Sequence, residues 1–453
     1  MTGSIPLAGG FPTVTRAEWR GSVLRPGGEP ERDLSTASDD GIPIGPVYQR
    51  IVAAPIAARP AGRKWRIIQR VSAPDAGSAL ARCHEERAGG ADGVALVFAN
   101  SLHPLPSALP PEAADAIAAG LAKTVDNGRV LTIDAGLRTA DVAPAFAKVT
   151  AQCNLVFDPV AAVAMGRSAE AAAAVARLAG LADTMSGTLA LADGRIWHAA
   201  GASEVQELAA VLATVIEYLR LFEVNGVTPE RAAARIGVAL AADTDQFLTI
   251  AKLRAMRLLL EHALTAAGIA ATLPLHAETA WRSMSRREPR MNALRATGAA
   301  FAAAVGGADS ITVLPFDGLD RAPSAEARRL ARNTQLVIAE EAQVYRFADP
   351  AAGSGAVESL TEALAERAWE KFQAIESTGG ILAALATGAI QDDIAATRDR
   401  RLARIAEGGV EMIGVNAFVA RSEEPLPAES EPGAHAAGGL VFTRLAEEVE
   451  ARA

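Results

Sequence analysis

The chain has 453 residues, of which half are hydrophobic and 21% are charged. This balance excludes disorder throughout and allows one large core with appended segments. The formal net charge of −9 gives no general attraction to nucleic-acid phosphates or anionic lipids, so we expect neither as a partner. No basic start followed by an apolar stretch and no run of about 18 apolar residues is present, so we expect a cytoplasmic protein.

The sequence predicts three parts. Residues 1–45 form an arm, because "PGGEPERDLSTASDDGIPIGP" is rich in turn-forming residues and acids while Phe11, Trp19 and Ile42 are isolated apolar anchors. Residues 46–420 form the main domain with its following helices. Residues 421–453 comprise a linker, "RSEEPLPAESEPGAHAAGG", and a short amphipathic helix in "LVFTRLAEEVEARA". We expect that last helix to dock onto its own domain or onto a partner.

Short apolar runs alternate with Ala-rich helical stretches along the main domain. The runs are Trp65–Val71, Gly93–Ala99 and those near Val130, Leu155, Leu189, Leu273, Val313 and Tyr345. Short runs bounded by Gly, Pro, Asp or Asn and joined by helices favour parallel strands. Eight of them predict an α/β fold, a (β/α)8 TIM barrel. The structural alternative is a doubly wound open sheet, which usually carries a glycine fingerprint after its first strand; this sequence has none.

A long helical block lies around the fifth and sixth predicted strands, in residues 203–226 and 244–268. Leu208, Val211, Leu212 and Val215 fall at three- and four-residue spacings, as one buried helix stripe requires. Ser203 is the expected N-cap of its first helix.

The sequence carries few local catalytic motifs. Its six histidines, at positions 84, 103, 198, 262, 276 and 435, include no His-x-x-x-His pair, and neither a Gly-x-Ser-x-Gly nor a Walker-type motif is present. The two cysteines, Cys83 and Cys153, are too few for a disulfide framework or a Cys-rich metal site. The sequence therefore predicts no metal site, and His84 with Glu85 and Glu86 is interpreted as a solvated helix face.

Three stretches are candidates for binding or catalysis. His198 falls between a predicted strand and a helix, where barrel active sites collect, and the alternative is a structural histidine. The turn Asp349–Thr361 could present backbone amides to a phosphate, and the alternative is a tight turn capped by Ser354. Five arginines could bind an anionic substrate or form a solvated or interface surface; they are Arg282, Arg286, Arg287, Arg290 and Arg295.

Over most of its length, the sequence resembles the methylmalonyl-CoA mutase family. The motifs that carry the resemblance are His276–Thr279, Asn292–Arg295, Ala303–Gly307, Ala331–Gln335 and Asp349–Ser354. The resemblance implies a TIM barrel whose axis holds the pantetheine arm of an acyl-CoA. It also implies adenosylcobalamin chemistry, in which the cofactor supplies the radical and the protein supplies orientation and a water-excluded cavity.

Departures from the family pattern concern the chemical residues. No histidine stands in the Asp-x-His-x-x-Gly motif that ligates cobalt, and the chain after Phe418 is too short for a cobalamin-binding domain. Ala61 follows Arg59 and Pro60 where an Arg-Pro-Trp element is expected, the segment "RIWHAAGA" is shortened, and a Thr-x-Gln-Asn-Asp segment is missing. His198 is then a degenerate remnant of the catalytic histidine, and we expect no catalytic or cofactor-binding residue in this chain.

Within the family, the sequence is similar to the shorter, inactive chain of heterodimeric bacterial mutases. This implies a catalytic large subunit as partner, with adenosylcobalamin bound there, and it makes "HAETAWRSM" (276–284) scaffold. Two alternatives stay open. In the first, the chain is an active substrate-binding subunit of a split acyl-CoA mutase. In the second, it is an adaptor whose altered surface or acidic linker at 422–432 binds the GTP-binding chaperone of such mutases.

Overall fold

The computed structural model describes residues 12, 14–23, 34–56, 59–106, 109–123, 130–149, 152–171, 174, 181, 184–420 and 439–452. Residues 421–438, which are all of the predicted linker except Gly439, and the anchor Phe11 lie outside these ranges.

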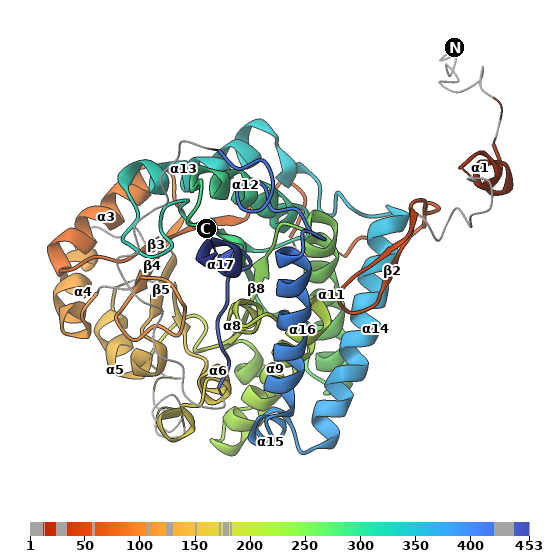
Figure 1. Ribbon diagram of the computed structural model, residues 1–453. Helices are drawn as coiled ribbons and strands as arrows, with labels where there is room; N and C mark the ends of the chain where they lie inside the picture. The colour runs from red at the N-terminus through yellow and green to blue at the C-terminus, as the bar shows by residue number, and fades with distance from the viewer. Residues whose placement is uncertain are drawn as a thin grey trace, which may run out of the picture.

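Eight parallel strands form the centre of the molecule (Figure 1). They are β3 (Arg66–Val71), β4 (Gly93–Val97), β5 (Val130–Asp134), β6 (Gln152–Val156), β7 (Ala190–Asp193), β8 (Ile236–Ala242), β9 (Leu275–Thr279) and β10 (Ser310–Thr312). Their order in the sheet is β6-β5-β4-β3-β10-β9-β8-β7.

The two end strands of this sheet are joined by backbone hydrogen bonds. The N–H of Leu155 donates to the carbonyl of Thr188 (2.9 Å), and the N–H of Leu191 donates to the carbonyl of Phe157 (3.0 Å). The sheet thus closes almost completely into a barrel, which confirms the predicted (β/α)8 fold class.

Helices surround the barrel. Those between or directly after strands are α3 (Ala76–Ala88), α4 (Ala114–Ala122), α5 (Thr139–Val142), α6 (Pro159–Ala164), α8 (Gly194–Ala199), α9 (Glu204–Val224), α10 (Pro229–Ala233), α11 (Gln246–Ala266), α12 (Arg290–Val305) and α13 (Ala325–Leu336). The later helices are α14 (Gly355–Ser377), α15 (Ile381–Ala386), α16 (Ala389–Ala406) and α17 (Glu447–Ala451). Short turns are η1 (Pro111–Ala113), η2 (Gly136–Arg138), η3 (Ala143–Phe146), η5 (Trp281–Ser283), the π-turn η6 (Val337–Glu341) and η7 (Val344–Arg346).

One of the eight predicted strands is wrong. The run near Tyr345 forms η7, because Gln343 before it adopts a left-handed conformation with φ of 54° and the chain turns there. The eighth strand is instead β8, whose sequence IGVALAA is buried at every position. It lies between α9 and α11, in the gap between the two stretches of the predicted helical block. Those two helices are otherwise confirmed.

The helix α9 begins where the sequence predicts. The Ser203 hydroxyl accepts from the N–H of Gln206 (3.2 Å), and the Gln206 side chain accepts from the N–H of Ser203 (2.9 Å). This capping box satisfies amides that the first helical turn leaves open. The long helix α14 packs across α9 and α11 and forms an additional layer outside the barrel (Figure 1).

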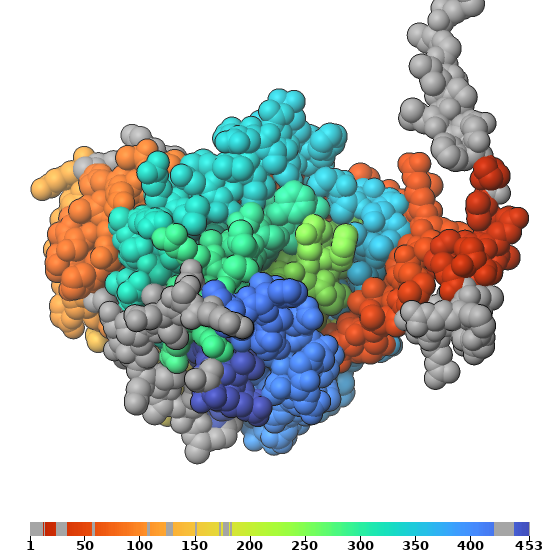
Figure 2. All heavy atoms as spheres, turned by 45° about the horizontal axis from the view of Figure 1, so that its top comes forward, coloured from red at the N-terminus to blue at the C-terminus, as the bar shows by residue number. Residues whose placement is uncertain are grey.

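The N-terminal arm stands out from one side of the barrel. Its helix α1 (Arg16–Val23) has no buried residue, and Figure 2 shows the red and orange atoms of this region projecting from the body. Closer to the barrel, the arm forms an antiparallel hairpin of β1 (Thr36–Ala37) and β2 (Pro43–Ile44).

The hairpin turn anchors the arm through two carboxylates. Asp39 accepts from the guanidinium of Arg401 (2.7 Å), while Asp40 accepts from the Ser203 hydroxyl and from the N–H of Val205 (3.2 Å) at the start of α9. The arm is therefore held at the N-terminus of a barrel helix by polar contacts.

Among the described helices, none is long and apolar enough to cross a bilayer.

Candidate functional site: the barrel axis and its two mouths

A cavity of about 260 Å³ runs along the barrel axis from the end where the strands begin. Residues that open or precede strands line its mouth, and residues near the strand ends close it. The side chains that carry charge or strong polarity along it are Arg59, Arg63, Lys64, Arg66, Arg70, Asp134, Gln152, Asn154, Arg195, His276, Glu278 and Asp309.

The mouth of the cavity is cationic. The guanidinium of Arg59 donates to the carbonyl of Ala304 (2.8 Å) and lies 5.5 Å from the centre of the Trp65 ring. Arg66 donates to the side chain of Gln152 across the opening. These contacts position positive charge around the entrance, where an anionic group would be attracted.

A layer of charged side chains closes the other end of the cavity. The Glu278 carboxylate pairs with Arg70 (3.2 Å) and with Arg195 (3.2 Å). Arg195 also pairs with Asp193 (2.6 Å), whose carboxylate lies 3.0 Å from Nε2 of His103. These residues come from β3, from β7 and the turn after it, from β9, and from the loop after β4. We call them, together with Asp134 of β5, the axial charge layer.

The neighbouring cations keep the two buried carboxylates, Glu278 and Asp193, ionised. Burial alone would raise the pKa of Glu278, but the Arg195 and Arg70 cations lower it to about 2. Burial likewise opposes the ionised form of Asp193, yet Arg195 and His103 hold its pKa well below the usual range. Both carboxylates are therefore ionised at neutral pH, and each neutralises a buried arginine.

His276 lies in the cavity rather than at its end. Its Nδ1 is 2.8 Å from the Ser310 hydroxyl of the neighbouring strand. Burial and the Arg195 cation lower the pKa of His276 to about 4. The imidazole is therefore neutral at physiological pH and adds no charge to the axis.

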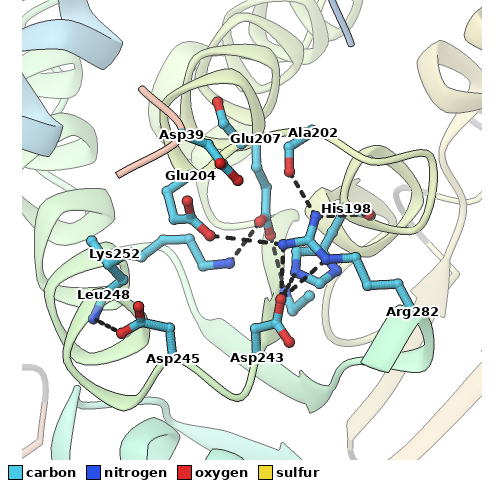
Figure 3. Close-up of polar contacts among 12 residues, drawn as sticks. Asp39, His198, Ala202, Glu204, Glu207, Asp243, Asp245, Leu248, Lys252 and Arg282 are labelled. Atoms are coloured by element: carbon cyan, nitrogen blue, oxygen red, sulfur yellow. Dashed lines mark hydrogen bonds and ion pairs between the residues drawn. The ribbon is translucent and has the colours of Figure 1, made fainter. Parts of the chain in front are cut away.

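His198 lies outside the cavity, in α8 directly after β7. Its Nε2 is 3.0 Å from the Asp243 carboxylate, which also accepts from the guanidinium of Arg282 (2.8 Å); Arg282 donates in turn to the carbonyl of Ala202 (2.8 Å) (Figure 3). Burial and Arg282 lower the pKa of His198 well below its ordinary value, so the imidazole is neutral and donates to Asp243. This candidate residue has the contacts of a buried structural histidine.

The C-terminal segment, residues 439–452, covers the opposite mouth of the barrel. Its amides donate to carbonyls that follow three different strands: Leu440 to Ala164 (2.9 Å), Thr443 to Ala199 (3.0 Å) and Leu445 to Arg282 (2.8 Å). Figure 1 shows this dark-blue segment and α17 crossing in front of the barrel. It docks on its own domain, one of the two outcomes expected from the sequence.

The five candidate arginines do not form one anion site. Arg282 is buried against Asp243, and the other four contact different groups near the surface of the C-terminal face. Those contacts are Arg286 with Asp320, Arg287 with the Val415 carbonyl, Arg290 with Glu326, and Arg295 with Asn292 and the Ile413 carbonyl. Each guanidinium thus has its own protein partner.

The remaining candidate stretch, the turn Asp349–Thr361, serves local structure. The Asp349 carboxylate accepts from the N–H of Ile56 (2.9 Å) and pairs with Arg254, so the turn ties the stretch before β3 to α11. Ser354 occupies the N-cap position of α14 without a side-chain capping bond. The interpretation of Glu86 as part of a solvated face is wrong: Glu86 is buried and pairs with Arg332, whereas His84 and Glu85 are exposed.

Sequence reasoning missed the axial charge layer. Its signal is a charged residue at the carboxyl end of an apolar strand, as in Asp134, Asp193 and Glu278. Parallel strands of a barrel bring such residues to one level of the axis. Nothing in the local sequence shows which of them pair.

Comparison with known proteins identifies relatives of the chain. The family profile described as "Methylmalonyl-CoA mutase" matches residues 188–437. The methylmalonyl-CoA mutase small subunit of Streptomyces virginiae is 35% identical, over 98% of this chain and 77% of its own length. The small subunit of Propionibacterium freudenreichii subsp. shermanii is 38% identical over 57% of this chain, and the probable small subunit of Mycobacterium bovis is 40% identical over 61%.

The chain spans different shares of these relatives. It covers 46% of the Mycobacterium bovis protein and 41% of the Propionibacterium protein. Among solved structures, 7,8-dihydropteroate synthase from Vibrio fischeri ES114 superposes with a TM-score of 0.38 at 14% identity, over 61% of this chain and 94% of its own, a likeness too low to carry an argument. The family profile, which matches more than half of the chain, and the 35% identity to the Streptomyces virginiae protein over 77% of its length show that the chain belongs to the methylmalonyl-CoA mutase family.

Proposed function

We propose that this chain is the small, non-catalytic subunit of an adenosylcobalamin-dependent methylmalonyl-CoA mutase. It supports a catalytic large subunit in the interconversion of methylmalonyl-CoA and succinyl-CoA. The observation that carries the proposal is the closed axis: the axial charge layer separates the cavity from the opposite mouth, and the C-terminal segment covers that mouth. Sequence similarity to small subunits of the family supports the same assignment.

The axial charge layer is costly to open. A ligand that passed through it would separate the buried Glu278 from Arg70 and Arg195. Breaking a buried ion pair without replacing its partner costs about 3–5 kcal/mol. An acyl group held in the cavity would therefore meet fixed, mutually neutralised charges instead of an open passage to the C-terminal face.

The described residues near the C-terminal mouth do not fit a corrin. His103 and His198, the histidines that follow β4 and β7, are buried, and each lies 3.0 Å from a carboxylate, that of Asp193 and of Asp243 respectively. The face above them is occupied by residues 439–452. His435 lies outside the described residues. These contacts support placing adenosylcobalamin on the large subunit, where it would supply the radical that starts the rearrangement.

The alternative of an active substrate-binding subunit needs an open axis, and the charge layer argues against it. The adaptor alternative involves residues 422–432, which lie outside the described part of the chain. It stays a prediction from the sequence.

Turnover of methylmalonyl-CoA with adenosylcobalamin tests the proposal. We expect none from this chain alone and turnover when it is purified together with the large subunit. The variant His198→Asn, which keeps an N–H donor for Asp243, should leave the kcat of that complex unchanged. Turnover by this chain with only an isolated cobalamin-binding domain would overturn the proposal and make the barrel a working active site.

A further inference from the structure

The strongest feature outside the axis is the surface that holds the C-terminal segment. Glu450 of α17 places its Oε1 against three donors: the Ser285 hydroxyl (2.9 Å), the N–H of Arg286 (2.6 Å) and the N–H of Arg287 (3.3 Å). Its Oε2 accepts from Arg444 (2.7 Å). Successive backbone amides aimed at one point form a concavity suited to an anion.

The turn that presents these amides is unusual. Ser285 is fully buried. Glu288, three residues later, has a φ of 41°, a left-handed conformation that non-glycine residues rarely adopt. Such conformations persist where the surrounding structure enforces them, often at binding sites. The Ser285 hydroxyl oxygen also lies 2.8 Å from the carbonyl oxygen of Arg287, so its single proton is shared between that carbonyl and Glu450.

Apolar contacts surround this carboxylate site. The rings of Phe442 and Trp281 meet edge to face with centroids 6.4 Å apart. Ala446 is fully buried and packs with Met412 and Val415, and Leu445 and Val449 pack against the same cluster. The surface thus contacts apolar residues of this C-terminal segment, most of which precede α17, and one carboxylate of α17 itself.

We propose that this surface is a receptor for an amphipathic helix bearing a carboxylate, and that residues 439–453 are its detachable occupant, able to bind the same surface as a separate peptide. The helix α17 has five residues, which is too short to be stable alone in water, so its form depends on the surface. Residues 421–438 separate it from Ala420, a stretch that spans up to about 60 Å when extended. Departure of the segment would expose Leu440, which packs in the main core, and the buried Arg444. Release would uncover the C-terminal mouth, whether or not the chain is catalytic.

Peptide binding to a chain that ends at residue 438 tests this inference. Three fluorescent peptides of residues 439–453 are titrated: the natural sequence, Glu450→Gln and Glu448→Gln. Glu448 lies on the same helix and pairs with the exposed Arg452, so it is the matched control. We expect saturable one-to-one binding, weakened about tenfold or more by Glu450→Gln and less than twofold by Glu448→Gln. Absence of saturable binding, or equal weakening by both changes, would overturn the inference.

A second measurement uses the full chain and does not depend on the folding of the truncated one. Hydrogen exchange at the amides of Arg286 and Arg287 is compared between the Glu450→Gln and Glu448→Gln proteins. Exchange about tenfold faster in Glu450→Gln alone is expected, because these amides lose a charged acceptor. A protease site placed within 421–438 then shows whether the cleaved segment dissociates on dilution; a segment that cannot be separated from the folded barrel refutes detachment.

Discussion

Glu278 shows how a single residue can decide the use of a barrel axis. Its carboxylate is shared by Arg70 and Arg195, and Glu278 itself is buried at the inner end of the cavity. A neutral side chain of the same shape would leave two buried guanidiniums with one weaker acceptor. The closure of the axis and the stability of the fold therefore depend on the same group.

We expect Glu278→Gln to lower the free energy of unfolding by about 3–5 kcal/mol, measured by urea denaturation at pH 7. Glu340→Gln is the matched control, since Glu340 pairs with Lys64 at the exposed surface, and it should have little effect. Equal losses in the two variants would show that the axial charge layer carries no special stability.

The same carboxylate predicts a sensitivity to acid. Its pKa is lowered from 4.5 to about 2 in the folded chain. The stability it contributes is thus fully present above about pH 4.5 and is lost as the pH falls toward 2. Between pH 5 and pH 3, the natural chain should lose more unfolding free energy than Glu278→Gln. A parallel decline of both proteins in pH-dependent denaturation would contradict this.

At the scale of elements, the hairpin turn before β2 controls the docking of the arm. Asp40 is mostly buried, and burial together with Glu204 raises its pKa from 3.8 to about 6. A carboxyl group whose pKa is raised in the docked state favours docking at low pH. The contribution of Asp40 to the stability of the docked arm is full below about pH 4, declines between pH 4 and 6, and is absent above about pH 6.

Asp40→Asn should remove this dependence and hold the arm more firmly above pH 6, because an amide can still accept from the N–H of Val205 without a buried charge. Asp39→Asn, the neighbouring change, should loosen the arm by removing the partner of Arg401 and Arg404. Hydrogen exchange over residues 36–44 between pH 4 and 8 measures both effects. Changes of the same sign would contradict the assigned roles.

Elements also show why sequence patterns succeed or fail. The strand β4 was predicted because Val94, Leu96 and Val97 form a run between Gly93 and Asn100. The strand β8 was missed because its alanines resemble the Ala-rich helices on both sides. Near Tyr345, the apolar run has the composition of a strand, but the left-handed Gln343 redirects the chain and the Tyr345 ring lies under the Lys64 ammonium.

On the scale of the whole molecule, the barrel was predictable and its closed axis was not. Fold class follows from the order of runs and helices, which is local information. The axial charge layer depends on bringing residues 70, 134, 193 and 278 to one level, and their pairing follows from register across strands far apart in sequence. His198 was correctly placed after a strand, but its bonding to Asp243 and Arg282 required the folded chain.

The closure between β6 and β7 is the weakest join of the barrel. Few backbone hydrogen bonds connect these strands, among them those from Cys153, Leu155 and Leu191, whereas their neighbours pair along whole strands. Under native conditions, these three amides should exchange before amides inside β5 or β8. Uniform protection around the barrel would show that the join opens only with global unfolding.

This join also marks the boundary between the two halves of the barrel. It separates four consecutive strands, β3 to β6, from four others, β7 to β10, so that each half of the barrel is one continuous stretch of chain. The family profile begins at residue 188, just before β7, and covers the second half and the helices that follow. Two half-barrels that meet along only two lines can diverge at different rates. We expect the first half to have changed faster and the second to preserve the ancestral family sequence.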